Sequence, residues 1–204
     1  LLEILDGYQV PLIEDDIYGD LHHDRQRPRA VKAFDRTGSV LLCSSFSKTL
    51  APGYRVGWIA PGRFADAVAR EKYLLSVATP TPTQMAIAAY VASGGYDRHL
   101  RRLRNTYRGL MARVASAVGE HFPHGTRVTH PRGGHVLWVE MPTGVDSLEL
   151  LRRARRHRIT FAPGPLFSCC GDYRHCLRLN CAVPWSETAA DALATLGRLA
   201  ARMM

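Results

Sequence analysis

The sequence contains little lysine, no long apolar run and an odd number of cysteines. No stretch approaches the roughly 18 apolar residues of a membrane-spanning helix, and the first residues lack the basic start and apolar segment of a signal peptide. We therefore expect a soluble, cytoplasmic chain with no membrane partner. The five cysteines show no C-x-x-C spacing, so neither a disulfide framework nor a zinc site is predicted, and no metal is expected.

Lysine is so scarce that each one stands out among the arginines. Of the 27 basic residues, only Lys32, Lys48 and Lys72 are lysines, and the formal net charge is +9. Such a basic balance raises the question of nucleic acid. The densest arginine run, 98–108, spaces its apolar residues by three and four, as on one face of a long helix. Because no recognition-helix motif accompanies this run, we interpret its arginines as a solvated face.

The order of the expected elements predicts an α/β fold. In the first part of the chain we expect helices at 1–8, 64–74 and 83–94, strands at 10–14, 40–44 and 56–60, and an extended loop at 79–82. Short apolar strands that alternate with helices favour a mostly parallel sheet. In such a sheet, ligands bind at the carboxyl ends of the strands.

A second, smaller α+β unit is expected in the carboxyl-terminal half. The turn Pro123–Gly125 marks a boundary after the long arginine-rich helix, and we divide the chain into residues 1–104 and 105–204. The strands expected there are 127–129, 136–140, 159–162 and 176–181, and the helices start at the caps Ser147 and Ser186. The chain is long enough for either one large core or two modest ones.

The stretch 41–58 has the features of a catalytic amine. Lys48 follows the second expected strand and the hydroxyls of Ser45 and Ser47, and Arg55 comes seven residues later. An amine that condenses with an aldehyde has to stand at the end of a rigid element, partly desolvated so that it is neutral part of the time. A phosphate beside it would bind hydroxyl donors and a bidentate guanidinium. The alternative is a buried strand that ends in an exposed lysine.

An acidic turn follows the first expected strand. The apolar run Val10–Ile13 stops at three successive acids, 14–16, and Tyr18 comes three residues after Asp15. By itself this pattern suits an ordinary acidic turn, which we favour over a metal site. Its place at the carboxyl end of a strand is that of a ligand-binding loop.

Arg178 stands in the middle of an otherwise apolar strand. Burying its charge between Leu177 and Leu179 would be costly unless an anion meets it. The alternative is that Arg178 lies exposed on an edge strand and that the two leucines point inward.

Together, these stretches resemble the fold-type I aminotransferases, enzymes that use pyridoxal phosphate (PLP). The matching motifs are Asp-x-x-Tyr at 15–18, Ser-x-Ser-Lys and Pro-Gly-x-Arg-x-Gly within 45–57, Gly-Gly at 133–134, and Pro-Gly-x-x-Phe at 163–167 with Arg-Leu-Asn at 178–180. Four separate motifs in the family's order cover nearly the whole chain, so the resemblance is highly specific. It implies that residues 1–104 are the carboxyl-terminal part of the PLP-binding large domain and that 105–204 form the small domain.

The resemblance also implies a role for each candidate residue. The residues that would hold PLP are Asp15, Tyr18, Ser45, Ser47, Lys48 and Arg55. Lys48 would form the Schiff base and act as catalytic base and acid, while Asp15 would pair with the pyridine nitrogen and Tyr18 with the phenolic oxygen of the ring. Arg178 would clamp the α-carboxylate of the substrate. The substrates would be an amino acid and a 2-oxo acid, and the protein would be a homodimer.

Some family features are missing from this sequence. No Asn-Pro-x-Gly turn, stacking aromatic residue or phosphate-binding loop precedes the aspartate strand, so we expect the chain to be the carboxyl-terminal part of a longer protein. Residues 96–107 and 184–187 most resemble the aminotransferase-like domain of MocR-type regulators in the GntR group, in which a winged helix-turn-helix comes first. Two functions stay open. One is a PLP-dependent aminotransferase, and the other is an effector domain that senses PLP or an amino compound and reaches DNA only through an upstream domain.

Overall fold

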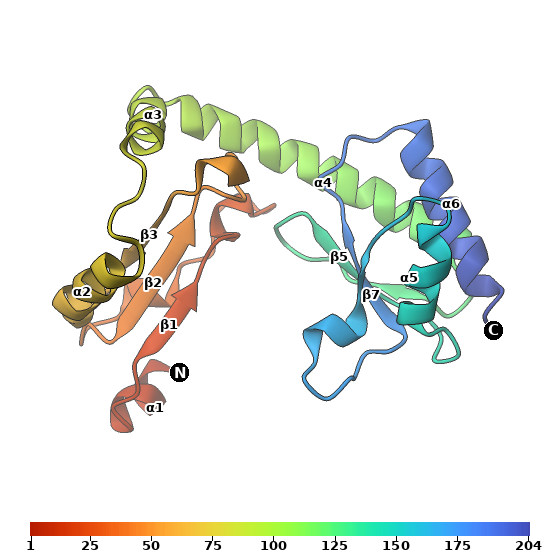
Figure 1. Cartoon of the computed structure of the whole chain (residues 1–204), viewed down its shortest axis with the longest axis horizontal. Coiled ribbons are helices and arrows are strands. Elements are labelled where there is room, and N and C mark those ends of the chain that lie inside the picture. The colour runs from red at the N-terminus through yellow and green to blue at the C-terminus, as the bar shows by residue number, and fades with distance from the viewer. The chain divides into compact units, whose positions relative to one another are not determined.

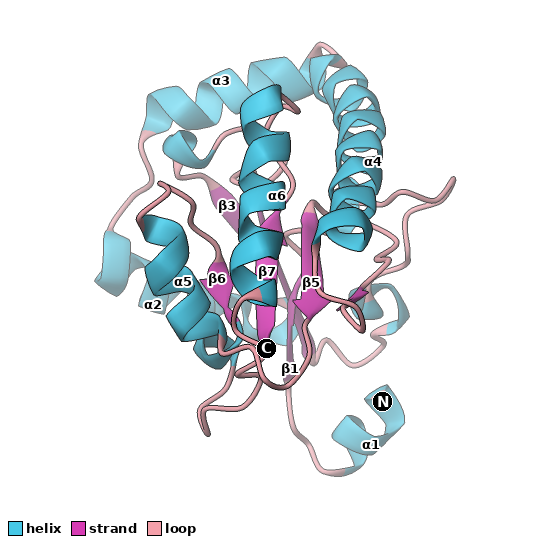
Figure 2. Ribbon diagram, turned by 90° about the vertical axis from the view of Figure 1, so that its right-hand side faces the viewer, coloured by secondary structure: helices cyan, strands magenta, loops and turns pink.

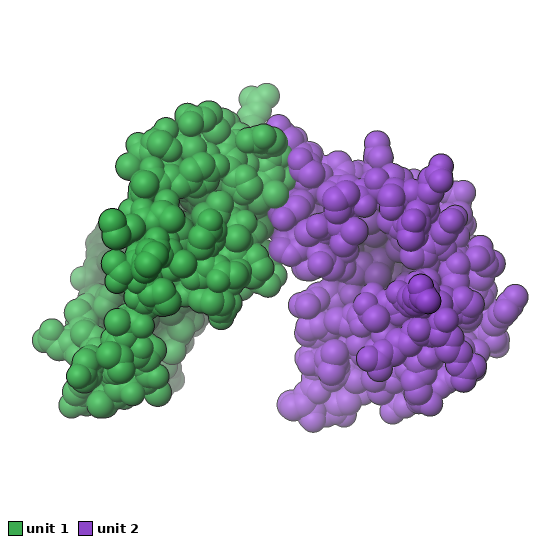
Figure 3. All heavy atoms as spheres, turned by 45° about the horizontal axis from the view of Figure 1, so that its top comes forward, with its two compact units in different colours: residues 1–104 green, residues 105–204 purple.

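The computed structural model describes residues 1–204 and divides them into two compact units, Leu1–Arg104 and Asn105–Met204 (Figure 3). The helices are α1 (Leu2–Gly7), α2 (Ala65–Ser76), α3 (Thr81–Ala92), α4 (Gly95–His121), α5 (Ser147–Arg155) and α6 (Glu187–Ala201). The strands are β1 (Leu12–Asp15), β2 (Val40–Ser45), β3 (Gly57–Ala60), β4 (Arg127–Val128), β5 (Val136–Glu140), β6 (Ala162–Pro163) and β7 (Cys176–Asn180). The predicted α/β class is confirmed. No helix combines the length and the apolar character that crossing a membrane requires.

The first unit is built on a three-stranded sheet in the order β1-β2-β3 (Figure 1). β1 and β2 run parallel, with Asp15 beside Cys43, so both strands end at the same edge of the sheet. β3 runs antiparallel to β2, a direction that the sequence pattern, which favoured a mostly parallel sheet, did not assign to it. A glycine is needed where β3 begins, because a Cβ on Gly57 would lie 2.9 Å from the carbonyl oxygen of Ser44.

A buried carboxylate holds the turn that leads into β2. The side chain of Asp35 is 2% exposed and accepts hydrogen bonds from Lys32 Nζ at 2.8 Å and from the backbone N–H groups of Ser39 and Val40 at 3.1 Å. Burial opposes ionisation of Asp35, but these donors outweigh it and hold the pKa of the carboxyl well below its usual range. One of the three lysines is thus used to stabilise the fold.

Few apolar side chains of the first unit are buried. Leu21 and Val40 are fully enclosed. Ile13 on β1 is 71% exposed, however, and Leu75 on α2 is 84% exposed. Both the sheet and the helices of this unit therefore present open apolar surface.

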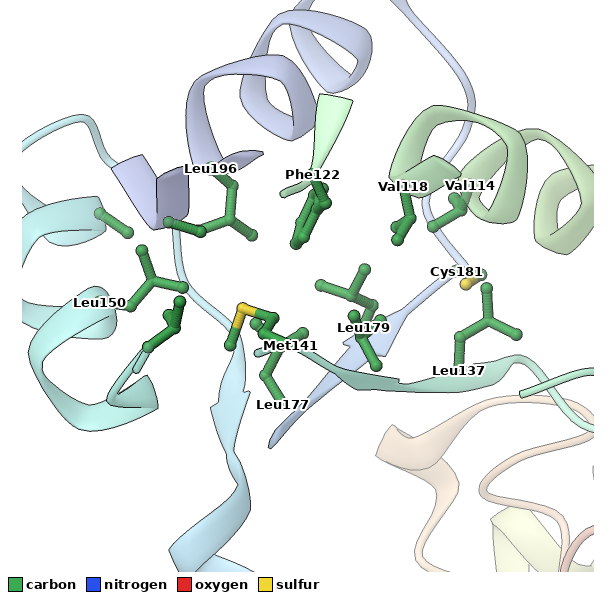
Figure 4. Close-up of a cluster of buried hydrophobic side chains, with 14 of the residues drawn as sticks. Val114, Val118, Phe122, Leu137, Met141, Leu150, Leu177, Leu179, Cys181 and Leu196 are labelled. Carbon is green, nitrogen blue, oxygen red and sulfur yellow. The ribbon is translucent and has the colours of Figure 1, made fainter. Parts of the chain in front are cut away.

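The second unit is a two-layer structure with a dense core. Its sheet has the order β4-β5-β7-β6 with antiparallel neighbours, and α5 and α6 cover one face (Figure 2). Figure 4 shows Val118 of α4, Leu150 of α5 and Leu196 of α6 directed toward Leu137 of β5 and Leu177 of β7. Alternation along the strands sends every second side chain into this core.

Helix α6 packs against α4 almost backbone to backbone. It begins as predicted at the Ser186 cap, whose Oγ accepts a hydrogen bond from the Ala189 N–H at 3.2 Å. A Cβ added to Gly197 in its middle would lie only 2.2 Å from the carbonyl oxygen of His121. Glycine is a poor helix former, so packing and not helix propensity accounts for its presence here.

Two helix starts differ from the prediction. α3 begins at Thr81 and not at residue 83, because Pro82 fits the first helical turn, where its missing N–H has no intrahelical partner to bond. The expected extended loop therefore ends two residues earlier. α5 is capped by Asp146 and not by Ser147: the Asp146 carboxylate accepts hydrogen bonds from two backbone N–H groups of the first turn at 2.9 and 3.0 Å.

Candidate active site

Lys48 lies on the turn that directly follows β2. The Leu50 N–H donates to the Phe46 carbonyl at 2.8 Å, and the Ser47 N–H donates to Ser45 Oγ at 3.3 Å. These bonds fix the backbone on both sides of the lysine. The Lys48 side chain is exposed and makes no hydrogen bond or ion pair within the chain. Its amine is therefore available to a ligand.

The residue after the lysine anchors this turn to α4. Thr49 is 3% exposed, and its Oγ1 accepts a hydrogen bond from the Tyr96 hydroxyl at 2.8 Å. Its carbonyl accepts a second one from His99 Nε2 at 2.9 Å. The Tyr96 ring packs edge-on against Phe46 with 5.6 Å between the ring centroids. These anchors could not be predicted from the sequence, because they join positions about 50 residues apart and form no local pattern.

Among the three successive acids at the end of β1, only Asp15 has no partner. The Glu14 carboxylate accepts two backbone N–H groups from the short helix Val31–Phe34, at 2.8 and 2.9 Å. Asp16 forms an ion pair with Arg27. The Asp15 side chain is exposed and makes no hydrogen bond or ion pair. Asp15 is thus the carboxylate that this turn leaves free for a ligand.

The loop after β1 is tied to the end of β2. Ser44 Oγ donates to the Asp16 carbonyl at 3.1 Å, and the Asp16 N–H donates to the Cys43 carbonyl at 2.8 Å. Burial, together with the nearby charge of Asp15, raises the pKa of the Cys43 thiol. Tyr18 is half-buried in the same loop.

Arg55 is held beside the lysine turn by an unusual backbone. It follows the short helix Pro52–Tyr54 in the left-handed region, with φ 52° and ψ 38°. The next residue is fixed to the turn, since the Phe46 N–H donates to the Val56 carbonyl at 3.1 Å. The Arg55 side chain is exposed, and its Nη1 donates to the Pro52 carbonyl at 3.3 Å. A non-glycine residue in this conformation stores on the order of 1 kcal/mol, and such strain clusters at functional sites.

The donor set of the first unit has the chemistry that PLP needs. It offers an unpaired amine at Lys48, an unpaired carboxylate at Asp15 and a guanidinium at Arg55, with the Ser45 and Ser47 hydroxyls between them in the chain. An aldehyde, a pyridine nitrogen and a phosphate would find their matching groups in this set. The residues present therefore fit the cofactor.

Arg178 belongs to the second unit and lies on the exposed face of its sheet. β7 is an inner strand, and Arg178 stands opposite Trp138 of β5. Its guanidinium carbon lies 4.8 Å from the centre of the Phe167 ring, and that ring packs edge-on against Trp138 at 5.4 Å. The alternative is wrong about the edge strand, because β7 has a neighbour on either side, but it is right that Arg178 is exposed and that the two leucines point inward. The expected burial is also wrong, because Arg178 faces outward while its two leucine neighbours point into the core.

The family model described as aminotransferase class I and II matches residues 1–196. The chain belongs to the class I and II aminotransferase family. Over all of its length it is 44% identical to the uncharacterized HTH-type transcriptional regulator YjiR of Escherichia coli (strain K12), of which it covers 43%. Over 88% of its length it is 32% identical to aromatic-amino-acid aminotransferase 1 of Thermococcus litoralis, of which it covers 43%.

The fold of this aminotransferase-family chain matches solved aminotransferases. Over 99% of the chain it superposes with a TM-score of 0.91 on LysN, the α-aminoadipate aminotransferase of Thermus thermophilus, at 29% identity and over 53% of that protein. LysN was solved in complex with N-(5'-phosphopyridoxyl)-L-leucine. The predicted resemblance to fold-type I aminotransferases and to MocR-type regulators is confirmed. The chain spans about half the length of the proteins that it matches.

Proposed function

We propose that this aminotransferase-family chain binds PLP through Lys48 and serves amino-group transfer between an amino acid and a 2-oxo acid. The observation that carries the proposal is the pair of unengaged side chains of Asp15, at the end of β1, and Lys48, on the turn after the adjacent parallel strand β2. The neighbouring acids are used in the fold, so the free pair has no structural task. In this proposal residues 1–104 belong to the PLP-binding large domain, and 105–204 form the small domain of a cytoplasmic homodimer.

Each residue of the first unit would have one task toward the cofactor. When bound, PLP supplies a protonated pyridine ring that accepts the electron pair of a carbanion. Asp15 would keep the ring nitrogen protonated, because a carboxylate beside it favours the charged form. Tyr18 would donate a hydrogen bond to the phenolic oxygen, and Ser45, Ser47 and Arg55 would bind the phosphate.

Lys48 and Arg178 would act on the substrate. Lys48 would hold the cofactor covalently before the substrate arrives. It would then serve the 1,3-proton shift, taking a proton from the substrate α-carbon as a general base and delivering it to the cofactor carbon as a general acid. Arg178 would bind the α-carboxylate in a two-bonded fork, a geometry that a lysine cannot reproduce. Its place above Phe167 keeps the guanidinium on the exposed face of the sheet.

Borohydride reduction of the intact protein with PLP tests the role of Lys48. A pyridoxyl label on Lys48 blocks tryptic cleavage there and should give a single labelled peptide, Thr37–Arg55. The Lys48→Arg variant should bind no label, with its fold intact. A label on Lys32 or Lys72 would overturn the assignment, and Lys32 already has a structural partner in Asp35.

The likeness to YjiR favours a second function for the same cofactor residues, that of an effector domain. Such a domain would sense PLP or an amino compound and pass the signal to DNA through a domain outside this chain. The intact protein should be supplied with an amino acid and a 2-oxo acid while PLP absorbance is followed. An enzyme forms a new amino acid over many turnovers, whereas an effector shows the spectral response and a changed DNA affinity without turnover.

A further inference from the structure

Two adjacent cysteines form an exposed dithiol in the second unit. Cys169 and Cys170 lie in the loop between the short helix Gly164–Phe167 and β7, the light blue segment that leads to β7 in Figure 1. Both side chains are exposed, and their Sγ atoms are 3.7 Å apart. The proposed amino-group transfer uses neither thiol.

The loop holds the two thiols together by its own hydrogen bonds. Ser168 Oγ donates to Asp172 Oδ2 at 3.0 Å and accepts hydrogen bonds from the backbone N–H groups of Cys170 at 3.1 Å and Asp172 at 3.2 Å. Gly171 adopts a φ of 77°, which reverses the chain just after the cysteines and suits glycine. The pair is therefore presented on a closed turn and not on an extended segment.

The other three cysteines are much less reactive by position. Cys43 is half-buried, and Cys176 and Cys181 are buried in the second unit. Burial raises the pKa of Cys43 and Cys176, and it raises that of Cys181 to about 12. Since the thiolate is the nucleophile, thiol chemistry should concentrate on the exposed pair.

We propose that Cys169 and Cys170 are a reversible redox site that closes to a vicinal disulfide. The oxidant is a small-molecule disulfide such as oxidised glutathione. One protein thiolate attacks it, forming a mixed disulfide and releasing one glutathione thiol. The second protein thiolate then attacks the sulfur of its neighbour, which closes the Cys169–Cys170 bond and releases the second glutathione thiol. The protein gives up two electrons and two protons, and one glutathione disulfide becomes two thiols.

The geometry makes this bond easy to reverse. Adjacent Cα atoms are about 3.8 Å apart. The two Cα atoms of an ordinary disulfide lie about 4.4–6.8 Å apart. The vicinal bond is therefore strained and easily reduced, as redox-responsive disulfides are and structural ones are not.

Closing the pair also acts on the surface around Arg178. Phe167 and Tyr173 flank the cysteine loop, and both rings pack edge-on against Trp138, at 5.4 and 5.6 Å. The Arg178 guanidinium in turn lies over the Phe167 ring. A change in the loop between the two rings therefore reaches the proposed carboxylate-binding arginine. This consequence rests on the proposed function, whereas the disulfide itself does not.

Peptide mapping of the intact protein tests the disulfide. Trypsin places both cysteines, and no other, in the peptide Ile159–Arg174. After incubation with oxidised glutathione this peptide should lose two hydrogen atoms and resist alkylation until a dithiol reductant is added. The peptides with Cys43, Cys176 and Cys181 should remain alkylatable after unfolding. Persistent glutathione adducts on the pair, or a disulfide between two chains, would overturn the proposal.

Single variants provide the matched control. In Cys169→Ser and in Cys170→Ser the second thiol is missing, so a glutathione adduct should accumulate on the remaining cysteine. Cys43→Ser should close the disulfide like the parent. Single variants that accumulate no more adduct than the parent would contradict the two-step exchange.

A spectral measurement separates this inference from the proposed function. The double variant C169S/C170S should keep the PLP spectral response to amino acids, and oxidised glutathione should change that response only in the parent protein. An intact protein that gives no response in either redox state would contradict the PLP proposal and leave the mapped disulfide standing. A response that is identical in both states would remove the link from the dithiol to Arg178.

Discussion

The two units bury apolar surface to very different degrees. The second unit encloses one continuous cluster that includes Leu137, Leu177 and Leu196. The buried apolar side chains of the first unit are only Leu21, Val40, Ile87 and Leu100. Since each fully buried side chain contributes about 1.5–3 kcal/mol, packing stabilises the second unit far more. The proposed cofactor residues thus lie in the unit that has little buried apolar surface and relies more on hydrogen-bonded carboxylates for its stability. Mutations that lower the stability of the protein and mutations that impair its chemistry should therefore fall at different residues.

The largest expected effect is the loss of core packing in the second unit. Leu177→Ala removes a fully buried side chain from the inner strand β7 and should lower the free energy of unfolding by about 2–5 kcal/mol. Leu75→Ala is the matched change on the first unit, where the side chain is 84% exposed, and should change it by less than about 0.5 kcal/mol. Hydrogen exchange resolved by peptide measures both. Equal effects would contradict the difference in packing.

An effect on chemistry without an effect on stability is expected at the first unit's free carboxylate. Asp15→Asn in the intact protein should raise the activation free energy of turnover by on the order of 3 kcal/mol, because the ring nitrogen loses the partner that keeps it protonated. The free energy of unfolding should hardly change, since the Asp15 side chain makes no hydrogen bond or ion pair in the fold.

The control is the next residue along the chain. Asp16→Asn weakens the ion pair with Arg27 and should affect the fold of the loop more than the chemistry. Steady-state rates and denaturant titrations of both variants decide between them. If Asp16→Asn stopped turnover while Asp15→Asn preserved it, the assignment of Asp15 would be wrong.

A pH-dependent effect is expected at the buried carboxylate of the first unit. Because the pKa of Asp35 is lower in the folded state, its contribution is present above about pH 4 and is lost as the pH falls through the folded-state pKa. Asp35→Asn should cost about 1–3 kcal/mol at neutral pH. The difference from the parent should shrink in acid. Hydrogen exchange of β2 peptides at several pH values measures it, and a pH-independent difference would contradict the charge-based cause.

The smallest expected effect is the loss of a helix cap in the second unit. Asp146→Ala removes the acceptor for two N–H groups of α5 and should cost about 1 kcal/mol. Ser147→Ala is the matched control, because the buried Ser147 hydroxyl has no hydrogen-bond partner and its removal should be neutral or stabilising. Thermal unfolding of both variants compares them. A larger loss of stability in Ser147→Ala than in Asp146→Ala would show that Ser147, as first expected, is the cap.

Local sequence patterns predicted a strand or a helix start correctly where neighbouring residues offered no competing choice. The strand at 136–140 is confirmed, where a short apolar run follows Gly133–Gly134, and so is the cap at Ser186, which directly follows Pro184–Trp185. At the start of α5 two cap formers stand side by side, and only the three-dimensional direction of their side chains selects Asp146. The strand expected at 159–162 forms only at its end, because Arg158 turns the chain with a φ of 61° and β7 pairs with just two residues there.

The candidate site could be predicted where its residues lie close together in the sequence. Lys48 and Asp15 each lie in a short stretch with a recognisable spacing, so the sequence could identify both. The support of Thr49 by Tyr96 and His99 depends on contacts between distant parts of the chain, which no local pattern records. That Asp15 is the free acid also could not be read from the sequence, since it depends on which neighbours find partners in the fold.

The contact of Gly197 with the His121 carbonyl also sets the register of α6 along α4. A slip of α6 by one turn would bring Leu193 or Ala201 to that point, and both carry a Cβ for which there is no room. The absence of a side chain at position 197 therefore allows one alignment of the two helices and excludes the alignments that are shifted by one turn. In a scan of all substitutions, position 197 should accept only glycine, although alanine extends a helix better by about 1 kcal/mol.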